Sequence, residues 1–541
     1  IITQYFKLFF LKGVAELRHM KKTTNSSQRH RLPLLAGLLM LATCLCGGMQ
    51  LASCSADRPV AYYIDPIAGN DANSGRSPQE AWQTLEKANA VSLMPGEQLL
   101  LKRGTTLNGQ LEISAKGTAG RLVTVGAYGP NTLPKPCIVG DDTSLYAVRI
   151  FNSEYLTLRD LEIVNTGKQP LPRRTGLKIE CRDYGVAHNI CIDGLTIRDV
   201  NGSPVKELGG GSGIYIVNEG EQVRSRFDSL VIQNCHIMRC TRNALIWAGY
   251  YDRRNWFPSK HTVVRYNLIE EVPGDGIVPI GCDSTLIEYN VMRNCPDVLP
   301  SSEAAAGFWP WSCDNTTIQF NHVSGHKAPW DAQAYDCDYN CTNTVIQYNY
   351  SHDNYGGLVL VCDSGNERTY SLGNQRSIVR YNISIGDGIR PKPTRQGMFS
   401  PGIHIAGRVE DTRIEHNIIH ANVKPGKDID RSMIVSDSWD GYAARTTFSR
   451  NIFYTAEPSR FDLTKSTDNT FSGNWYLGTY TALPDDPEAK TSCPQYEEQI
   501  LAAGSDGYHG LEKLMKQRDV CGSSFPFIDK ERIEAFFGQL P

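Results

Sequence analysis

The chain has 541 residues, of which 40% are hydrophobic and 21% are charged, and this composition excludes an extensively disordered chain. The formal net charge of −3 excludes binding of nucleic acid or of an acidic polymer through bulk positive charge, so an anionic substrate would need a local cluster of Arg and Lys. The 48 glycines, together with many Asn and Asp, indicate frequent turns and therefore β-structure.

Residues 1–54 are typical of an export signal. Met20 has the features of a start residue, with residues 1–19 upstream of it, and basic residues then precede a hydrophobic run from Leu32 to Cys46. This run is short for a membrane span. The following Leu51-Ala52-Ser53-Cys54 resembles a bacterial lipobox, which predicts lipid attachment at Cys54; a secretory signal cut near Ala56 is the alternative. We therefore expect an exported protein, a periplasmic or cell-surface lipoprotein anchored in the outer-membrane lipid.

Residues 60–148 predict a cap and the first coils of a β-fold. A strand from Tyr62 and a loop lead into a short amphipathic helix around Ala81 to Ala90, and strands separated by turn residues follow Pro95-Gly96. Four stretches resemble the opening of pectate-lyase-like, right-handed parallel β-helix enzymes of Bacteroidetes: YYIDP, SGRSPQEAWQTL, PGEQLLLKRG and VTVGAYG. The resemblance implies an N-terminal cap followed by the first coils of a β-helix.

From about Arg149 a repeat begins, in which an apolar residue is followed three positions later by Asn. Its spacing of about 23 to 35 residues predicts a solenoid whose stacked coils bury one continuous core. We expect the asparagines to form one hydrogen-bonded column, a structural role: Asn267, Asn290, Asn321, Asn349, Asn382, Asn417, Asn451 and Asn474. The predicted fold is an all-β, right-handed parallel β-helix over residues 60–480.

The cysteines and the C-terminal segment complete this assignment. Thirteen cysteines follow Cys54, and an odd number leaves at least one unpaired. Cys282, Cys313 and Cys341 have matching places in successive repeats, which favours a buried column over disulfides. Residues 481–541 predict a C-terminal cap, in which PDDPEAK is a linker and the part from about Gln495 is helical with an extended SFPFID piece.

The candidate site lies where exposed strands from successive repeats stack. In order these are GIYIV at 213, ALIWA at 244, GIVPI at 276, GFWPW at 307, AYDCD at 334, LVLVC at 358 and GIHIA at 402. Side chains alternate faces along a strand, so Trp309 and Trp311 point outward beside Asp336 and Asp338. Exposed aromatic rings bury sugar faces, and neighbouring carboxylates raise one another's pKa. This pattern predicts a carbohydrate-cleaving groove with Asp336 and Asp338 as the acid–base pair.

Alternatives for these four residues remain open: a calcium site or a solvated turn for the aspartates, and cover by a neighbouring loop for the tryptophans. Two insertions flank the stack, of which Ala248 to His261 is aromatic and basic. Further carboxylates expected to support catalysis are Asp331, Asp353 and Asp363. Further residues expected to bind substrate are Trp330, His326, His352, His404 and Arg408.

The segment WDAQAYDCDYNCTNTVIQYNYSHDNYGG resembles a motif of β-helix glycoside hydrolases, a group related to enzymes that act on fucosides and xylans. Many of those sequences have an acidic residue before the Gly-Gly pair, where this chain has Tyr355. The resemblance implies a glycoside hydrolase acting on a polysaccharide or oligosaccharide, and we expect a monomer. It specifies neither the sugar nor the linkage.

Two other functions fit the same fold. A polysaccharide lyase would hold Ca²⁺ through Asp336, Asp338 and Asp363, with Lys327, Arg390 or Arg408 as the base. A non-catalytic β-helix that binds glycans is the third possibility. The aromatic and acidic character of the outward face favours the hydrolase, for which no cofactor is expected.

Overall fold

The computed structural model describes residues 60–364, 370–393 and 399–492, together with residues 515–520, 523–528 and 531. The chain divides into two units, Ile1–Ala56 and Asp57–Pro541, and all described residues belong to the second. The predicted lipid-attachment residue Cys54 lies outside the described residues and stays a prediction. In the part of the chain that is described, no helix combines the length and the apolar character needed to cross a membrane.

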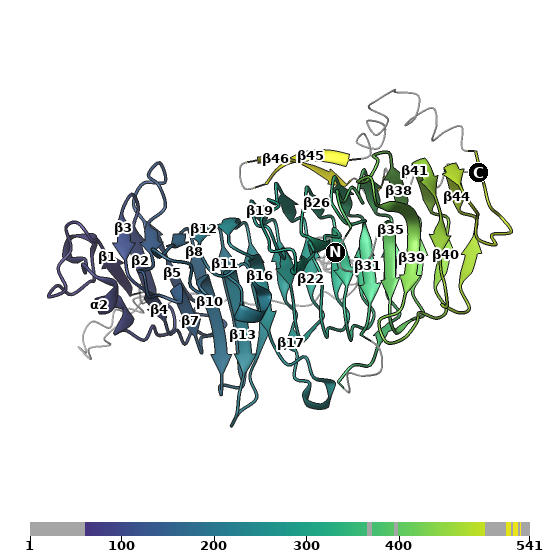
Figure 1. The fold of residues 1–541 in the computed structure, drawn as a ribbon. Helices are drawn as coiled ribbons and strands as arrows, with labels where there is room; N and C mark the ends of the chain where they lie inside the picture. The colour runs from purple at the N-terminus through teal and green to yellow at the C-terminus, as the bar shows by residue number, and fades with distance from the viewer. Residues whose placement is uncertain are drawn as a thin grey trace, which may run out of the picture. The chain divides into compact units, whose positions relative to one another are not determined.

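The described chain is a parallel β-helix, whose coils follow one another in chain order (Figure 1). A 16-stranded sheet runs from β1 (Ala61–Ile64) to β43 (Thr470–Ser472), and a 13-stranded sheet runs from β3 (Thr106–Asn108) to β44 (Trp475–Tyr480). Neighbouring strands within each sheet are parallel, as the repeat predicts.

A third face completes the coils, and it is built from two sheets. The first sheet consists of β4 (Leu111–Ile113), β7 (Tyr146–Phe151), β10 (Thr175–Arg182), β13 (Ser212–Glu219), β16 (Asn243–Ala248) and β20 (Ile277–Val278). The second consists of β28 (Tyr335–Cys337), β31 (Val359–Cys362), β35 (Phe399–Ala406), β39 (Asp430–Asp437) and β42 (Phe461–Asp462). Isolated bridges from Ile277 to Phe308 and from Phe308 to Tyr335 join the two sheets across one coil.

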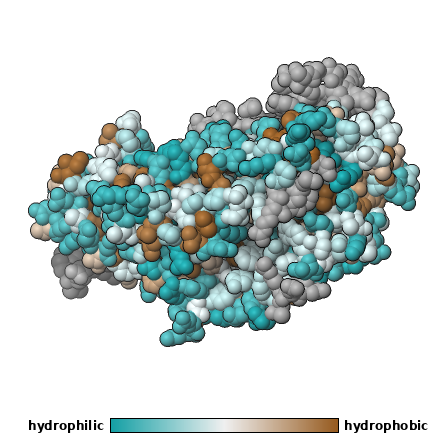
Figure 2. All heavy atoms as spheres, in the orientation of Figure 1, coloured by the Kyte–Doolittle hydropathy of each residue, from teal (hydrophilic) through white to brown (hydrophobic). Residues whose placement is uncertain are grey.

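Inward-facing aliphatic and aromatic residues of all three faces form one core cluster, which includes Ile64 at one end and Tyr476 at the other. At the surface, hydrophobic residues lie scattered among hydrophilic ones in the view of Figure 2. A single coil has too little apolar surface to fold alone, so the stack is stabilised by burial between coils.

The predicted asparagine column is confirmed. Each side-chain oxygen accepts hydrogen bonds from the coil before it; Asn321 Oδ1, for example, lies 2.9 Å from the backbone N and 3.0 Å from Nδ2 of Asn290. The eight side chains are buried. The column ends on Asp486, whose Oδ2 accepts from Asn474 N and Nδ2 at 3.0 and 2.9 Å. The stretch expected to be a linker therefore supplies the carboxylate that closes the column.

The cysteine column is confirmed as well. Cys282, Cys313 and Cys341 are fully buried, and the backbone N of Cys282 donates to Cys313 Sγ at 3.3 Å. No two cysteines of the described ranges form a disulfide with each other. The small thiols thus fill one corner of successive coils, as their matching positions predict.

Both terminal segments differ in part from expectation. The N-terminal helix α2 covers only Leu85–Asn89 and follows the 3-10 turn η1 (Pro78–Glu80). The two helical segments are separate because Trp82, which lies between η1 and α2, forms a β-bridge with Ile64 and is extended. Near the C-terminus, β45 (Met515–Val520) pairs antiparallel with β46 (Ser523–Ile528). The extended SFPFID piece is confirmed, but the helical prediction is wrong for 515–520, because this segment pairs with the β-prone SSFPFI strand.

Candidate active site

Outward-facing side chains of the third face form rows that run across the coils. The inward residues Ile277, Phe308, Tyr335, Val359 and Ile403 are aligned from strand to strand. The residue after each of them therefore belongs to one outward row, in the order Val278, Trp309, Asp336, Leu360 and His404. The predicted order of strands is thus confirmed, and Trp309 lies one coil, about 4.8 Å, from Asp336.

A cavity of about 280 Å³ opens on this row. Its walls carry four carboxyl groups and three tryptophans, and Lys206 is the single cation among the described residues that line it. The lining residues are Lys206, Asp275, Ala304, Ala305, Ala306, Trp309, Trp311, Asp331, Asp336, Asp338, Tyr339, Leu360, Cys362 and Trp439. Three of the five predicted catalytic aspartates therefore meet in one place.

Asp336 is an almost fully buried carboxyl group that lines this cavity. Only 4% of the residue is exposed, and its Oδ1 has no hydrogen-bond partner among the described residues. Burial raises the pKa of Asp336 well above its usual value, and the nearby carboxyl groups of Asp331 and Asp338 raise it further. Burial and the neighbouring carboxyl groups thus favour the protonated form of Asp336.

Asp338, the residue that follows the end of β28, is partly exposed and accepts two hydrogen bonds at one oxygen. Its Oδ1 accepts hydrogen bonds from the backbone N of Tyr339 at 2.7 Å and from the Cys362 thiol at 3.1 Å. Burial outweighs these bonds and raises the pKa of Asp338 to about 6. Burial also keeps the Cys362 thiol protonated by raising its pKa well above the usual value, so that the thiol remains a donor. Asp338 can therefore exchange a proton near neutral pH.

Asp331 reaches the cavity from a separate strand pair, β24 (Ala304–Ala305) with β27 (Trp330–Asp331). Asp331 and Ala332 have φ angles of 55° and 60°, the left-handed region that is unfavourable for residues with a Cβ. Arg390 holds this segment, because its guanidinium donates to the carbonyl oxygens of Asp331 at 2.7 Å, of Ala328 at 3.5 Å and of Pro329. Arg390 is 4% exposed, and burial lowers its pKa to about 10.

Asp275 is the fourth carboxylate, and its role is to fix the wall. Its Oδ1 accepts from Trp309 Nε1 and from the backbone N of Ala306, each at 3.1 Å, and its Oδ2 pairs with Arg242 at 2.5 Å. Burial alone would raise the pKa of Asp275, but Arg242 and Lys206 outweigh burial and hold the pKa below its usual value. The pKa values of Asp275 and Asp336 are therefore shifted in opposite directions within one cavity.

The tryptophans line the cavity, but they are less exposed than predicted. Trp309 is 4% exposed, because its indole N–H donates a hydrogen bond to Asp275 and the Lys206 ammonium lies over its ring, with Nζ 5.3 Å from the ring centroid. Trp311 is half-buried under Tyr251 of the 248–261 insertion, with ring centroids 5.2 Å apart. The alternative of cover by a neighbouring loop thus applies to one face of Trp311.

The other predicted residues do not line the cavity: Asp353, Asp363, Trp330, His326, His352, His404 and Arg408. Asp363 is fully buried and accepts from the backbone N of Asn340 at 3.1 Å. Asp353 lies 2.6 Å from His352 Nδ1 beside β30 (Tyr350–His352) in the 13-stranded sheet, on a different face of the coil. The structure therefore does not bring these two carboxylates into the cavity: Asp353 lies on another face of the coil, and the buried Asp363 is bonded to Asn340.

The remaining predicted binding residues have structural surroundings. His326 is fully buried with Nε2 2.8 Å from the Gly274 carbonyl oxygen, and Arg408 donates to the Ser371 carbonyl oxygen at 3.0 Å. Trp330 precedes Asp331 on β27. His404 is 1% exposed and packs edge-to-face against Trp439, with ring centroids 5.7 Å apart. His404 therefore contacts a residue that lines the cavity without lining it itself.

The residues named for the calcium and lyase alternatives are only partly present at this cavity. Within the described ranges, no three His, Cys, Asp or Glu side chains are placed to hold a metal ion, and Asp363 does not line the cavity with Asp336 and Asp338. Lys327, Arg390 and Arg408 do not line the cavity either.

Sequence reasoning missed Asp275, Lys206, Tyr339 and Trp439. Asp275 stands in a GDGI corner that reads as an ordinary turn, and Lys206 comes from the 3-10 turn η2 (Lys206–Leu208) in a loop two coils earlier. Trp439, an aromatic residue in the polar stretch DSWDG, was the one detectable signal.

Comparison with known proteins agrees with this fold. The family model described as "Right handed beta helix region" matches residues 212–433. The coils are those of a right-handed β-helix. A lacto-N-biosidase of Bifidobacterium longum is 26% identical over an alignment of 444 residues that covers 64% of this chain and 27% of that protein. The chain thus spans about a quarter of that relative.

The solved structure of a GH136 lacto-N-biosidase from Eubacterium ramulus is also similar. The native protein aligns with a TM-score of 0.56 and 23% identity over 80% of this chain and 68% of that one. Its selenomethionine derivative aligns with a TM-score of 0.52 and 25% identity over 66% and 67%. This chain is therefore similar to carbohydrate-active β-helix enzymes that are glycoside hydrolases by name. The grouping with fucoside- and xylan-acting enzymes stays a prediction.

Proposed function

We propose that this chain is a glycoside hydrolase that binds an oligosaccharide in the cavity between Trp309 and Trp439. The observation that carries the proposal is the meeting of Asp331, Asp336 and Asp338 in one aromatic-walled cavity. Aromatic rings offer rigid apolar surfaces to sugar rings, and carboxyl groups with different protonation states supply acid and base at one pH.

In this proposal Asp338 donates the proton to the glycosidic oxygen, because its pKa is raised to about 6 and one of its oxygens is already held by Tyr339 and Cys362. Asp331 acts on the anomeric carbon, directly or through a water molecule. Asp336, which is almost fully buried and neutral, donates a hydrogen bond to the sugar instead of reacting. The reacting pair thus differs from the pair expected from strand alternation, since Asp331 replaces Asp336.

For the substrate, we propose a lacto-N-bioside, because the similar proteins are named lacto-N-biosidases. The test is the release of sugar from an aryl lacto-N-bioside and from a panel of other oligosaccharides and polysaccharides. Ultraviolet absorbance of an unsaturated product would instead reveal a lyase. The configuration of the first product, followed by NMR, tells whether Asp331 attacks directly, which gives retention, or activates water, which gives inversion.

Three variants test the roles: Asp331→Asn, Asp338→Asn and Asp336→Asn. The first two should reduce kcat by at least about 100-fold, since each removes a group that reacts. Asp336→Asn keeps a hydrogen-bond donor and should chiefly change KM. Asp353→Asn, a carboxylate outside the cavity, is the matched control and should leave both constants unchanged. Full turnover by Asp331→Asn and Asp338→Asn on a cleaved substrate would contradict the proposal.

A further inference from the structure

The insertion between β16 and β17 (Ser259–Lys260) continues the aromatic wall of the cavity outward. Its residue Tyr251 is 43% exposed, although it is a large aromatic residue. The Tyr251 ring stacks on Trp311 with centroids 5.2 Å apart and planes inclined by 19°. Because Trp311 itself lines the cavity, Tyr251 extends the same wall beyond the cavity mouth.

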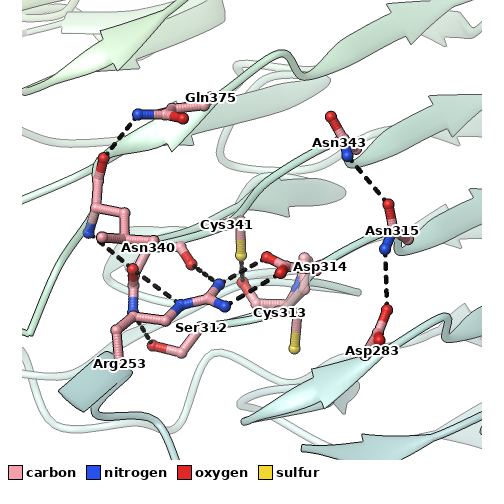
Figure 3. A network of polar contacts seen from close by, with 12 residues as sticks. Arg253, Asp283, Ser312, Cys313, Asp314, Asn315, Asn340, Cys341, Asn343 and Gln375 are labelled. Carbon is pink, nitrogen blue, oxygen red and sulfur yellow. Dashed lines mark hydrogen bonds and ion pairs between the residues drawn. The ribbon is translucent and has the colours of Figure 1, made fainter. Parts of the chain in front are cut away.

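A buried arginine fixes this insertion to the coils (Figure 3). Arg253, in the 3-10 turn η3 (Arg253–Asn255), donates to both carboxylate oxygens of Asp314 at 3.2 and 2.7 Å. It also donates to the side-chain and backbone oxygens of Asn340 at 3.2 and 2.7 Å. Only 8% of the Arg253 side chain is exposed. Asp314 and Asn340 belong to successive coils, so one guanidinium joins the insertion to two coils.

Asn340 connects this clamp to the aromatic residue. Its Nδ2 donates to the Tyr251 carbonyl oxygen at 3.2 Å and to Ser312 Oγ at 2.8 Å. The backbone of Tyr251 is thereby held in the same network that holds Arg253. An exposed aromatic ring that is ordered before binding loses little conformational freedom when a ligand stacks on it. The network therefore has the effect of presenting the Tyr251 ring in a fixed position.

We propose that Tyr251 is an outer sugar-binding subsite, which takes the pyranose ring adjoining the disaccharide unit held in the cavity. This inference rests on the proposed function and adds that the substrate is a chain longer than the released unit. Arg253 is a positioning residue, because it contacts the insertion and the coils, whereas Tyr251 contacts the sugar. The occupant is a neutral sugar ring, whose C–H face packs on the aromatic plane.

The test compares a short and a long substrate that the wild-type protein cleaves, such as an aryl lacto-N-bioside and an oligosaccharide with further sugar units. Tyr251→Ala should lower kcat/KM for the long substrate by about threefold to tenfold, the effect of one aromatic stacking contact, and leave the short one within about twofold. Tyr251→Phe retains the ring and should behave as wild type. Arg253→Met should reproduce the loss on the long substrate, and Tyr155→Ala, on a distant coil, should have no effect.

The outcomes separate the two proposals. If the wild-type protein cleaves neither substrate nor any member of the panel, the proposed function fails and the subsite fails with it. If cleavage occurs but Tyr251→Ala affects short and long substrates equally, or affects neither, only the subsite is wrong. A thermal unfolding midpoint of Tyr251→Ala close to that of Tyr155→Ala confirms that the comparison is between folded proteins.

Discussion

Replacing Arg390 by Met should free the segment that carries Asp331, so that the Asp331 side chain no longer has a fixed position in the cavity. The Arg390 guanidinium donates strongly to the carbonyl oxygens of Asp331 and Pro329, and within the described residues no carboxylate lies within ion-pair distance of it. Two hydrogen bonds from a charged donor contribute about 3–6 kcal/mol. Asp331 and Ala332, both in the left-handed region, carry about 2–4 kcal/mol of strain together. The hydrogen bonds of Arg390 thus outweigh the strain, and when these bonds are lost the segment 331–332 can relax.

The matched control is Arg431→Met. Arg431 is equally buried, its pKa is also lowered to about 10 by burial, and it donates to two backbone carbonyl oxygens, of Asp387 and Val423. Neither carbonyl belongs to the segment that carries Asp331. Arg431→Met should therefore lose about 3–6 kcal/mol of unfolding free energy in urea, and Arg390→Met only about 1–2 kcal/mol, because relaxation of the strained segment offsets part of the lost bonds. Only Arg390→Met should also lose catalysis, with kcat at least about tenfold lower and KM within about twofold.

Steady-state kinetics on the cleaved substrate, at a temperature where both variants are folded, measures this difference. Arg390→Lys retains a charged donor and should recover part of the lost kcat. The reasoning is refuted if the two Met variants show the same loss of unfolding free energy and the same unchanged kcat, because Arg390 would then be an ordinary structural arginine. It is equally refuted if Arg390→Met raises KM and leaves kcat unchanged.

Three further predictions follow from the site, the column and the export signal. Because Asp338 donates only while protonated, kcat/KM should fall as pH rises through about 6. The unfolding free energy should decline as pH rises from about 4 to 6, since the folded-state pKa of Asp338 is raised above the unfolded value. Asp338→Asn should make this decline shallower, because Asp336 and Asp387, whose pKa values burial also raises, keep their own share of it, and an unchanged slope would contradict the assignment. Asn321→Leu leaves buried donors of Asn290 unsatisfied and should cost about 1–3 kcal/mol in urea unfolding. Gln347→Leu, which removes a partly exposed amide that bonds Gln319 across the coils, should cost under about 0.5 kcal/mol, and equal losses would disprove a special role of the column. Labelling with a fatty-acid analogue should be lost in Cys54→Ala, and equal labelling would exclude lipid attachment there.

The fold was predictable because its rules are local and repeated. An asparagine such as Asn321 recurs once per coil, and its side chain can satisfy only donors that stack directly beneath it. Strand alternation then orders the outward row from Val278 to His404 without knowledge of any loop. The asparagine column, the buried thiols and the adjacency of Trp309 and Asp336 all follow from these two regularities.

The site was predictable only where it lies on the repeat. Asp336 and Asp338 are strand residues, so alternation places them, whereas Asp331 reaches the cavity through two consecutive left-handed residues that no propensity predicts. Lys206 and Trp439 come from loops on other coils. Asp353 and Asp363 were expected at the site because they are close in sequence, but corners separate them from it.

The four carboxyl groups of the cavity acquire different protonation states from the uneven distribution of cations around them. Asp275 lies against Arg242 and within the field of Lys206, and these cations keep its pKa low despite full burial. The pKa of Asp336 is instead raised, because this side chain is almost fully buried and lies near the carboxyl groups of Asp331, Asp338 and Asp275. Asp338 lies between these extremes, because hydrogen bonds from Cys362 and Tyr339 partly offset its burial. A single cluster of aspartates therefore contains one carboxyl group with a lowered pKa and two with raised pKa values, and acid–base cleavage of a glycosidic bond requires carboxyl groups that differ in this way.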